Sequence, residues 1–243
     1  KNQFRAHLMG LKLINTCYKK NIVLMVAYNL RFLPSLIEFK SQIQTNKIGN
    51  IYSVRSEIGQ YLPSWRPESN YKDTVSASKS LGGGALLELS HEIDYLGWIF
   101  GSIIWVKSHI SKLSNLDVDV EDSAKIILGL KGANDSELVV SLNMDFIRHD
   151  YTRRCFVSGE KGTLLWDGIS GKVEYFEKGT ENWITIFSSK PTRDYTYEEQ
   201  IKAFFSSIES NELSFISGDD GAKTVSIIEA IKKSSDIEST VYL

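Results

Sequence analysis

The chain has 243 residues, of which 42% are hydrophobic and 24% charged, and its formal net charge is −2. These values are ordinary for a globular protein, and the length allows one large domain or two small ones. A charge so near zero gives no sign of a nucleic-acid or anionic membrane partner, and no apolar run is long enough to span a membrane. We therefore expect a cytoplasmic protein in which the two distant cysteines, Cys17 and Cys155, are reduced.

The first 30 residues have the pattern of a helix followed by a buried strand. Apolar side chains recur at helical spacing between residues 4 and 20, and residues 22–28 are almost all apolar. Such a pair is typical of an α/β layer, but it is too small to form a domain by itself.

The next segment alternates short regular elements with one long loop. A helix is predicted over residues 34–45, starting at Pro34, and a strand over residues 51–60. Residues 61–80 show no period and form an unusually long loop that contains Tyr61, Trp65 and Arg66. Long loops in compact domains are often functional, so these side chains either contact a ligand or pack as a lid on the core.

One amphipathic helix is predicted over residues 85–100, between the glycines at 82–84 and Gly101. Glu88, His91 and Tyr95 share its polar face, with Asp94 at the edge, and together they could line a cleft. His91 could equally be a structural histidine, and a metal site with Glu88 and Asp94 is a weaker alternative because no further ligand is evident. The opposite, apolar face is predicted to enter the core and consists of Ala85, Leu86, Leu89, Ile93, Leu96 and Phe100.

After this helix the pattern changes to successive strands. Strands are predicted at residues 103–111, 123–130, 137–144, 152–158, 164–166, 172–176 and 183–187, with turns at 132–135 and 159–162. Two helices, over residues 197–210 and 219–237, close the chain. The expected fold class is α+β, in which a mostly antiparallel open-faced sheet carries helices on one face.

Several motifs resemble those of the Gfo/Idh/MocA family, named after glucose–fructose oxidoreductase and inositol dehydrogenase. Residues 82–94 resemble the family signature G-G-G-x-L-x-D-x-G-x-H-x-x-D. The other matches follow in order and are Tyr-Asn-Leu-Arg-Phe-Leu-Pro at 28–34, Ile-Gly-Asn-Ile at 48–51, Trp65-Arg66 and Gly-Glu-Lys-Gly at 159–162. One departure is that Leu87 stands four residues before His91, where the signature has Asp, and the carboxylate is Glu88.

The resemblance implies a division into two parts. Residues 1–30 would be the C-terminal remnant of a Rossmann nucleotide-binding domain, and residues 31–243 an α+β domain for substrate binding and oligomerisation. No G-x-G-x-x-G motif occurs in the chain, so the phosphate-binding loop, like the family's Glu-Lys-Pro motif, would lie upstream of residue 1. The chain as given is therefore expected to be inactive and to bind NAD or NADP weakly.

The resemblance also implies hydride transfer between NAD(P) and a hydroxyl or carbonyl carbon of a sugar, sugar derivative or cyclitol. His91 is the expected catalytic residue, because its ordinary pKa suits proton transfer near neutral pH. No metal is expected. The remaining site assignments are substrate binding by Glu88, Asp94, Tyr95, Arg31 and Arg153, and cofactor binding by Asn29, Trp65 and Arg66.

The expected partners are a sugar-like small molecule and further copies of the chain, in a homodimer or homotetramer that covers the free face of the sheet. Lys79 and Arg154 are, with Arg31 and Arg153, candidates to bind a charged substrate group. The alternative function is a non-catalytic dimerisation or ligand-binding module derived from the same family.

Overall fold

The computed structural model describes residues 2–132 and 136–243, and side chains from residue 10 onward within them. This part of the chain contains one nine-stranded sheet with the order β8-β7-β6-β5-β1-β4-β3-β2-β9. The strands are β1 (Ile51–Gly59), β2 (Ser102–Ser111), β3 (Ser123–Lys131), β4 (Glu137–Asp145), β5 (Thr152–Gly159), β6 (Gly162–Asp167), β7 (Lys172–Glu177), β8 (Trp183–Ser188) and β9 (Val241–Tyr242). The helices are α1 (Asn2–Lys19), α2 (Pro34–Gln44), α3 (Ala85–Glu88), α4 (His91–Phe100), α5 (Tyr195–Ser210) and α6 (Gly218–Asp236).

Strand β1 lies in the middle of the sheet, between β5 and β4, although it is the first strand in the chain. It pairs antiparallel with β5 and parallel with β4, and the other pairings in the described residues are antiparallel. The parallel pair needs a long crossover, which contains the loop, α3 and α4. Helix α4 is thereby carried across the centre of the sheet.

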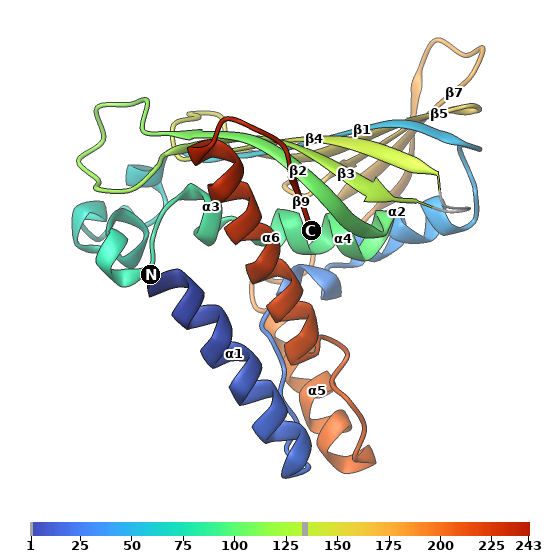
Figure 1. Cartoon of the computed structure of the whole chain (residues 1–243). Coiled ribbons are helices and arrows are strands. Elements are labelled where there is room, and N and C mark those ends of the chain that lie inside the picture. Colours follow the sequence, from blue (N-terminus) through green and yellow to red (C-terminus); the bar gives the residue numbers. More distant parts are fainter. Residues whose placement is uncertain (1, 133–135) are drawn as a thin grey trace.

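The helices lie on one face of the sheet (Figure 1). Helices α2, α3, α4 and the C-terminal half of α6 cover this face, whereas α1 and α5 extend away from the sheet. Helix α6 also protects the part of β2 that the short strand β9 leaves unpaired, because the hydroxyls of Ser234 and Ser235 accept the backbone N–H groups of Ser108 and Ile110. This arrangement confirms the predicted α+β fold with an open-faced, mostly antiparallel sheet.

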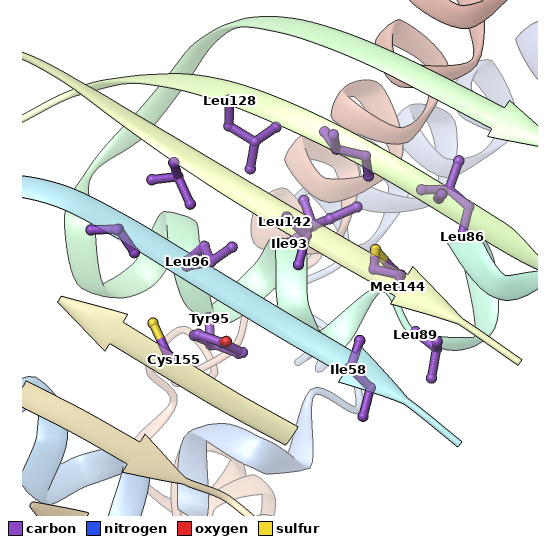
Figure 2. Close-up of a cluster of buried hydrophobic side chains, with 14 of the residues drawn as sticks. Ile58, Leu86, Leu89, Ile93, Tyr95, Leu96, Leu128, Leu142, Met144 and Cys155 are labelled. Carbon is purple, nitrogen blue, oxygen red and sulfur yellow. The ribbon is translucent and has the colours of Figure 1, made fainter. Parts of the chain in front are cut away.

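The core lies between the sheet and α4 (Figure 2). The apolar helix face predicted from the sequence is confirmed, because every one of its six residues is buried. In the strands, side chains alternate between the core and the free face, as in β4, where Val140 and Leu142 are buried and Val139 is exposed. The alternation in sequence therefore decided which face the helices cover.

The predicted helix over residues 85–100 is wrong in one respect, because it is two helices with a break at Leu89 and Ser90. Helix α3 is held at its start by Glu121, whose carboxylate accepts the N–H of Leu86 and whose backbone C=O accepts the N–H of Ala85. Helix α4 is held by ion pairs of its own, described below. The two halves are thus anchored to different parts of the molecule, and their helical phases are not continuous.

The predicted strand over residues 22–28 is also wrong. The segment forms one isolated bridge, between Met25 and Ser217, and one further backbone bond from the Val26 N–H to the Ile216 C=O. A strand needs a partner along its length, and the described residues provide one over only this short stretch. The loop at 61–80 contains four short 3₁₀ turns, the pairing of β9 was not predicted, and residues 133–135 of the predicted turn lie outside the described residues.

Neighbouring positions on α2 test the burial pattern. Leu36 is fully buried and Ile37 is 47% exposed. We expect Leu36→Ala to lower the free energy of unfolding by about 2–5 kcal/mol, because it leaves a cavity in the core. Ile37→Ala, its control, should change this free energy by less than about 1 kcal/mol. Urea denaturation followed by circular dichroism measures both, and equal losses would contradict the assignment of the α2 core face.

Candidate functional site

The imidazole of His91, the first residue of α4, lies against the ring of Tyr28. The two rings meet edge to face, with centroids 5.3 Å apart and an interplanar angle of 85°. Burial, together with the nearby charge of Arg153, lowers the pKa of His91 to about 4. The buried Nδ1 atom of His91 has no hydrogen-bond partner among the described residues. The ring is therefore neutral at pH 7, and its pKa lies below the near-neutral value that the sequence led us to expect.

Glu92, the next residue of α4, is fully buried and forms an ion pair with Arg153 of β5. The Nε atom of Arg153 donates to Oε1 of Glu92 at 2.9 Å, and Oε2 of Glu92 has no partner among the described residues. Burial raises the pKa of the Glu92 carboxyl, and Arg153 opposes this rise. Glu92 was not among the site residues predicted from the sequence, where its only signal was its place beside His91.

Asp94 forms a second buried ion pair, with Arg31 of the 3₁₀ turn η1 (Asn29–Phe32). Both carboxylate oxygens of Asp94 accept from the guanidinium, at 2.9 Å from Nε and 2.7 Å from Nη2. The same Nη2 is 3.5 Å from Oδ1 of Asp220 at the start of α6. The sequence analysis predicted that Arg31 and Asp94 bind substrate, but here each is the main partner of the other.

The polar helix face predicted from Glu88, His91 and Tyr95 is wrong. Tyr95 is fully buried in the core, where its hydroxyl lies 2.6 Å from that of Ser56 and its ring is close to Cys155 (Figure 2). Because Tyr95 is three residues after Glu92, the two share the inner face of α4. In this conformation Tyr95 presents no surface to a substrate, contrary to its predicted role.

Glu88 ends α3 and faces the long loop. Its Oε2 accepts a hydrogen bond from the Ser76 hydroxyl at 2.8 Å. Ser76 also borders a small hollow with Trp65 and Arg66, so the structure brings these two loop residues near Glu88. Trp65 donates from Nε1 to the Gln60 C=O at 3.0 Å, and the Arg66 side chain is exposed.

The other predicted basic and cofactor residues lie apart from His91. Asn29 donates from Nδ2 to the Thr196 hydroxyl of α5 at 2.8 Å. Arg154 is on the free face of the sheet, where its Nε is 3.0 Å from Oδ2 of Asp167. Lys79 is exposed at the end of the long loop.

A cavity of about 330 Å³ lies between α4, α6 and β2, bordered by the Arg31–Asp94 pair. Its walls include Trp98, Ile227 and Thr224. The hydroxyls of Thr224 and Ser90 are close to Tyr28. Burial raises the pKa of Tyr28, and hydrogen bonds with these two hydroxyls oppose part of this rise. Tyr28 is therefore near both His91 and Thr224, a residue of the cavity wall.

Other broad properties limit the chemistry. Among the described residues, no three His, Cys, Asp or Glu side chains are placed to hold a metal ion. In the same part of the chain, no helix is long and apolar enough to cross a membrane.

Two dehydrogenases are similar in sequence to this chain, one over most of its length and one over a shorter part. Myo-inositol 2-dehydrogenase of Thermotoga maritima is 24% identical over 247 residues, which cover 96% of this chain and 68% of the relative. Levoglucosan dehydrogenase of Pseudarthrobacter phenanthrenivorans is 36% identical over 94 residues, which cover 38% of this chain and 23% of the relative.

Solved structures share the fold. Levoglucosan dehydrogenase in complex with NADH superimposes with a TM-score of 0.80 at 21% identity, over 97% of this chain and 70% of that one. The aldose-aldose oxidoreductase of Caulobacter crescentus, complexed with glycerol, also has a TM-score of 0.80, at 18% identity, over 98% of this chain and 69% of that one.

A family model decides the membership of the chain. Residues 40–243 match the model described as the oxidoreductase family, C-terminal alpha/beta domain, of Gfo/Idh/MocA proteins. This match covers most of the chain and includes the end of α2, the helices α3 to α6 and the whole sheet. As the motif at residues 82–94 predicted, the chain belongs to the Gfo/Idh/MocA family of oxidoreductases.

Proposed function

We propose that this protein is an NAD(P)-dependent oxidoreductase that transfers a hydride between nicotinamide and a hydroxyl or carbonyl carbon of a sugar, sugar derivative or cyclitol. The observation that carries the proposal is the place of His91, which begins α4 and packs edge to face against Tyr28, in a chain of this family. Relatives named as dehydrogenases of myo-inositol and levoglucosan support the substrate class.

His91 is the proposed proton carrier. When bound, NAD(P) supplies the hydride acceptor or donor. During oxidation the substrate carbon loses a hydride, its hydroxyl proton passes to the neutral ring of His91, and a carbonyl remains. During reduction the imidazolium returns the proton to the new alkoxide oxygen. Glu88 is proposed to bind a substrate hydroxyl beside the long loop, where Ser76 fixes its carboxylate.

Residues 1–30 are proposed to be the end of a nucleotide-binding Rossmann domain. Helix α1 packs on α6, and the Tyr18 hydroxyl donates a hydrogen bond to Asp219. The family match begins at residue 40, after this segment. Of the three proposed cofactor residues, Asn29 and Trp65 are hydrogen-bonded within the chain, and exposed Arg66 has the side chain best suited to hold a phosphate.

The first test concerns His91 in the protein with its nucleotide-binding domain. After a screen of sugars and cyclitols has identified a substrate, we expect His91→Asn to lower turnover by about 10²–10⁴-fold, the usual contribution of a positioned proton carrier. Cofactor affinity should change little. Glu88→Gln is expected to cause a smaller loss, because it removes a charge but keeps a hydrogen-bonding side chain.

Two results would count against this assignment. Normal turnover in His91→Asn with lower thermal stability would make His91 a structural residue. A complete absence of NAD(P)-linked activity with sugars and cyclitols would favour the non-catalytic binding module instead.

The charge of His91 predicts a pH dependence of stability. Its pKa is about 4 in the folded chain and about 6.5 when unfolded, so the unfolded state binds more protons between these values. The His91 contribution to the free energy of unfolding should be complete above about pH 6.5 and fall by at most about 3 kcal/mol as the pH drops to about 4. In His91→Gln this part of the decline should vanish. Identical urea-denaturation profiles for the two proteins from pH 7 to pH 4.5 would contradict it.

Homo-oligomerisation through the free face of the sheet is also proposed. Ile127, Val139 and Trp183 are all more than one third exposed on strands of this face. A large apolar surface of this kind is normally covered by another subunit. Light scattering should give a dimer or tetramer at micromolar concentration, and Val139→Asp should dissociate it. Val75→Asp, at an exposed loop position, is the control, and a monomeric unmodified protein would refute the proposal.

A further inference from the structure

His91 lies between two carboxylates of the same helix, Glu92 and Asp94, and each of them is paired with an arginine from another element. At 100° per residue, Glu92 is about 100° from His91 in one direction around α4, and Asp94 is about 60° from it in the other. Glu92 pairs with Arg153 of β5, and Asp94 pairs with Arg31 of η1. Because the two arginines come from different elements, α4 cannot rotate about its axis without breaking one pair.

We propose that Glu92 and Arg153 are positioning residues: their ion pair fixes the rotation of α4 that turns His91 toward Tyr28, and it holds the Arg153 guanidinium in place relative to the imidazole. This inference rests on the proposed role of His91 in the reaction. It goes beyond that role because it assigns a function to Glu92, which occupies a position that the family signature leaves unspecified.

Stability alone does not account for the Glu92–Arg153 pair. Its side chains are 0% and 16% exposed, and the desolvation of such a pair commonly outweighs the attraction between the charges. In addition, Oε2 of Glu92 and Nδ1 of the adjacent His91 are both buried without a partner among the described residues. Apolar side chains of the same size would fill this space at lower cost. The pair is better explained by the effect of the Arg153 charge on His91.

The surroundings of His91 make Arg153 the dominant charge. Tyr28 faces the ring from the segment before η1 and is neutral at pH 7. On α4 itself, Glu92 is paired with Arg153, Asp94 is neutralised by Arg31, and Tyr95 is buried on the inner face. Glu88 precedes the break and is bonded to Ser76. A fixed cation beside a buried imidazole disfavours the imidazolium, and Glu92 fixes that cation.

The adjacent residue on β5 offers a matched control. Arg154 forms the same kind of pair, with Asp167, at 3.0 Å. It projects to the opposite, free face of the sheet, and 44% of its side chain is exposed. Arg153→Gln and Arg154→Gln therefore remove the same group from neighbouring positions, and only the charge at the first position acts on His91.

The experiment is an NMR titration of the histidine rings in the protein, with the His91 signal identified by its loss in His91→Gln. Arg153→Gln should raise the pKa of His91 by about one unit or more, since it removes a like charge. Glu92→Gln should leave this pKa at or below its original value, because Arg153 keeps its charge. Arg154→Gln should leave it unchanged.

The difference between Arg153→Gln, which should raise the pKa of His91, and Glu92→Gln, which should not, separates this role from simple packing. If loosening of the structure were the cause, both Arg153→Gln and Glu92→Gln would move the pKa of His91 up, toward its ordinary value, and the proposal would be overturned. An unchanged pKa in Arg153→Gln would overturn it as well. If Arg153→Gln does not fold, the double variant with Glu92→Gln keeps two hydrogen-bonding amides and should show the same rise.

Turnover provides a second readout that depends on the proposed function. Glu92→Gln should lower kcat more than it raises KM, because the carboxylate is buried and does not contact substrate. The titration requires no activity, so it tests the positioning role even if His91→Asn shows that His91 carries no proton in the reaction.

Discussion

The ion pair between Arg31 and Asp94 is the interaction on which the arrangement of the helical layer depends. It joins the turn after residue 28 to the first turn of α4, and through Asp220 it also reaches the start of α6. Asp220 in turn caps α6 with Ser217, so one guanidinium is connected to three elements. Removal of one partner from a buried pair costs about 3–5 kcal/mol, because the other charge is left buried alone. The position of His91 follows from this connection.

The sheet provides the rigid surface against which that helical layer is placed. Its order puts β1 at the centre, and the crossover from β1 to β2 lays α4 across β1, β4 and β3. Serines of α6 bind N–H groups at the β2 edge. The helices cover one face of the sheet, and the opposite face is its free surface. One face of the sheet therefore serves the candidate site, and the other is available to a second subunit.

The signature around His91 has a shortened spacing, and its two polar residues lie in different helices. The carboxylate of Glu88 is three residues before His91, where the signature has four, and the helix is interrupted between them at Leu89 and Ser90. Glu88 consequently ends α3 and bonds to the loop, while His91 begins α4 and faces Tyr28. The two residues keep their order in the sequence but have separate surroundings.

Local patterns in the sequence determined the fold class, most strand positions and the apolar helix face, because periods of two and 3.6 residues are visible without knowledge of neighbours. Family membership also followed from the order of the motifs. The tertiary structure alone decided that Tyr95 is in the core and that Glu92 pairs with Arg153, 61 residues away. It also decided that residues 22–28 do not form a strand, because pairing and charge compensation depend on what other elements place opposite each residue.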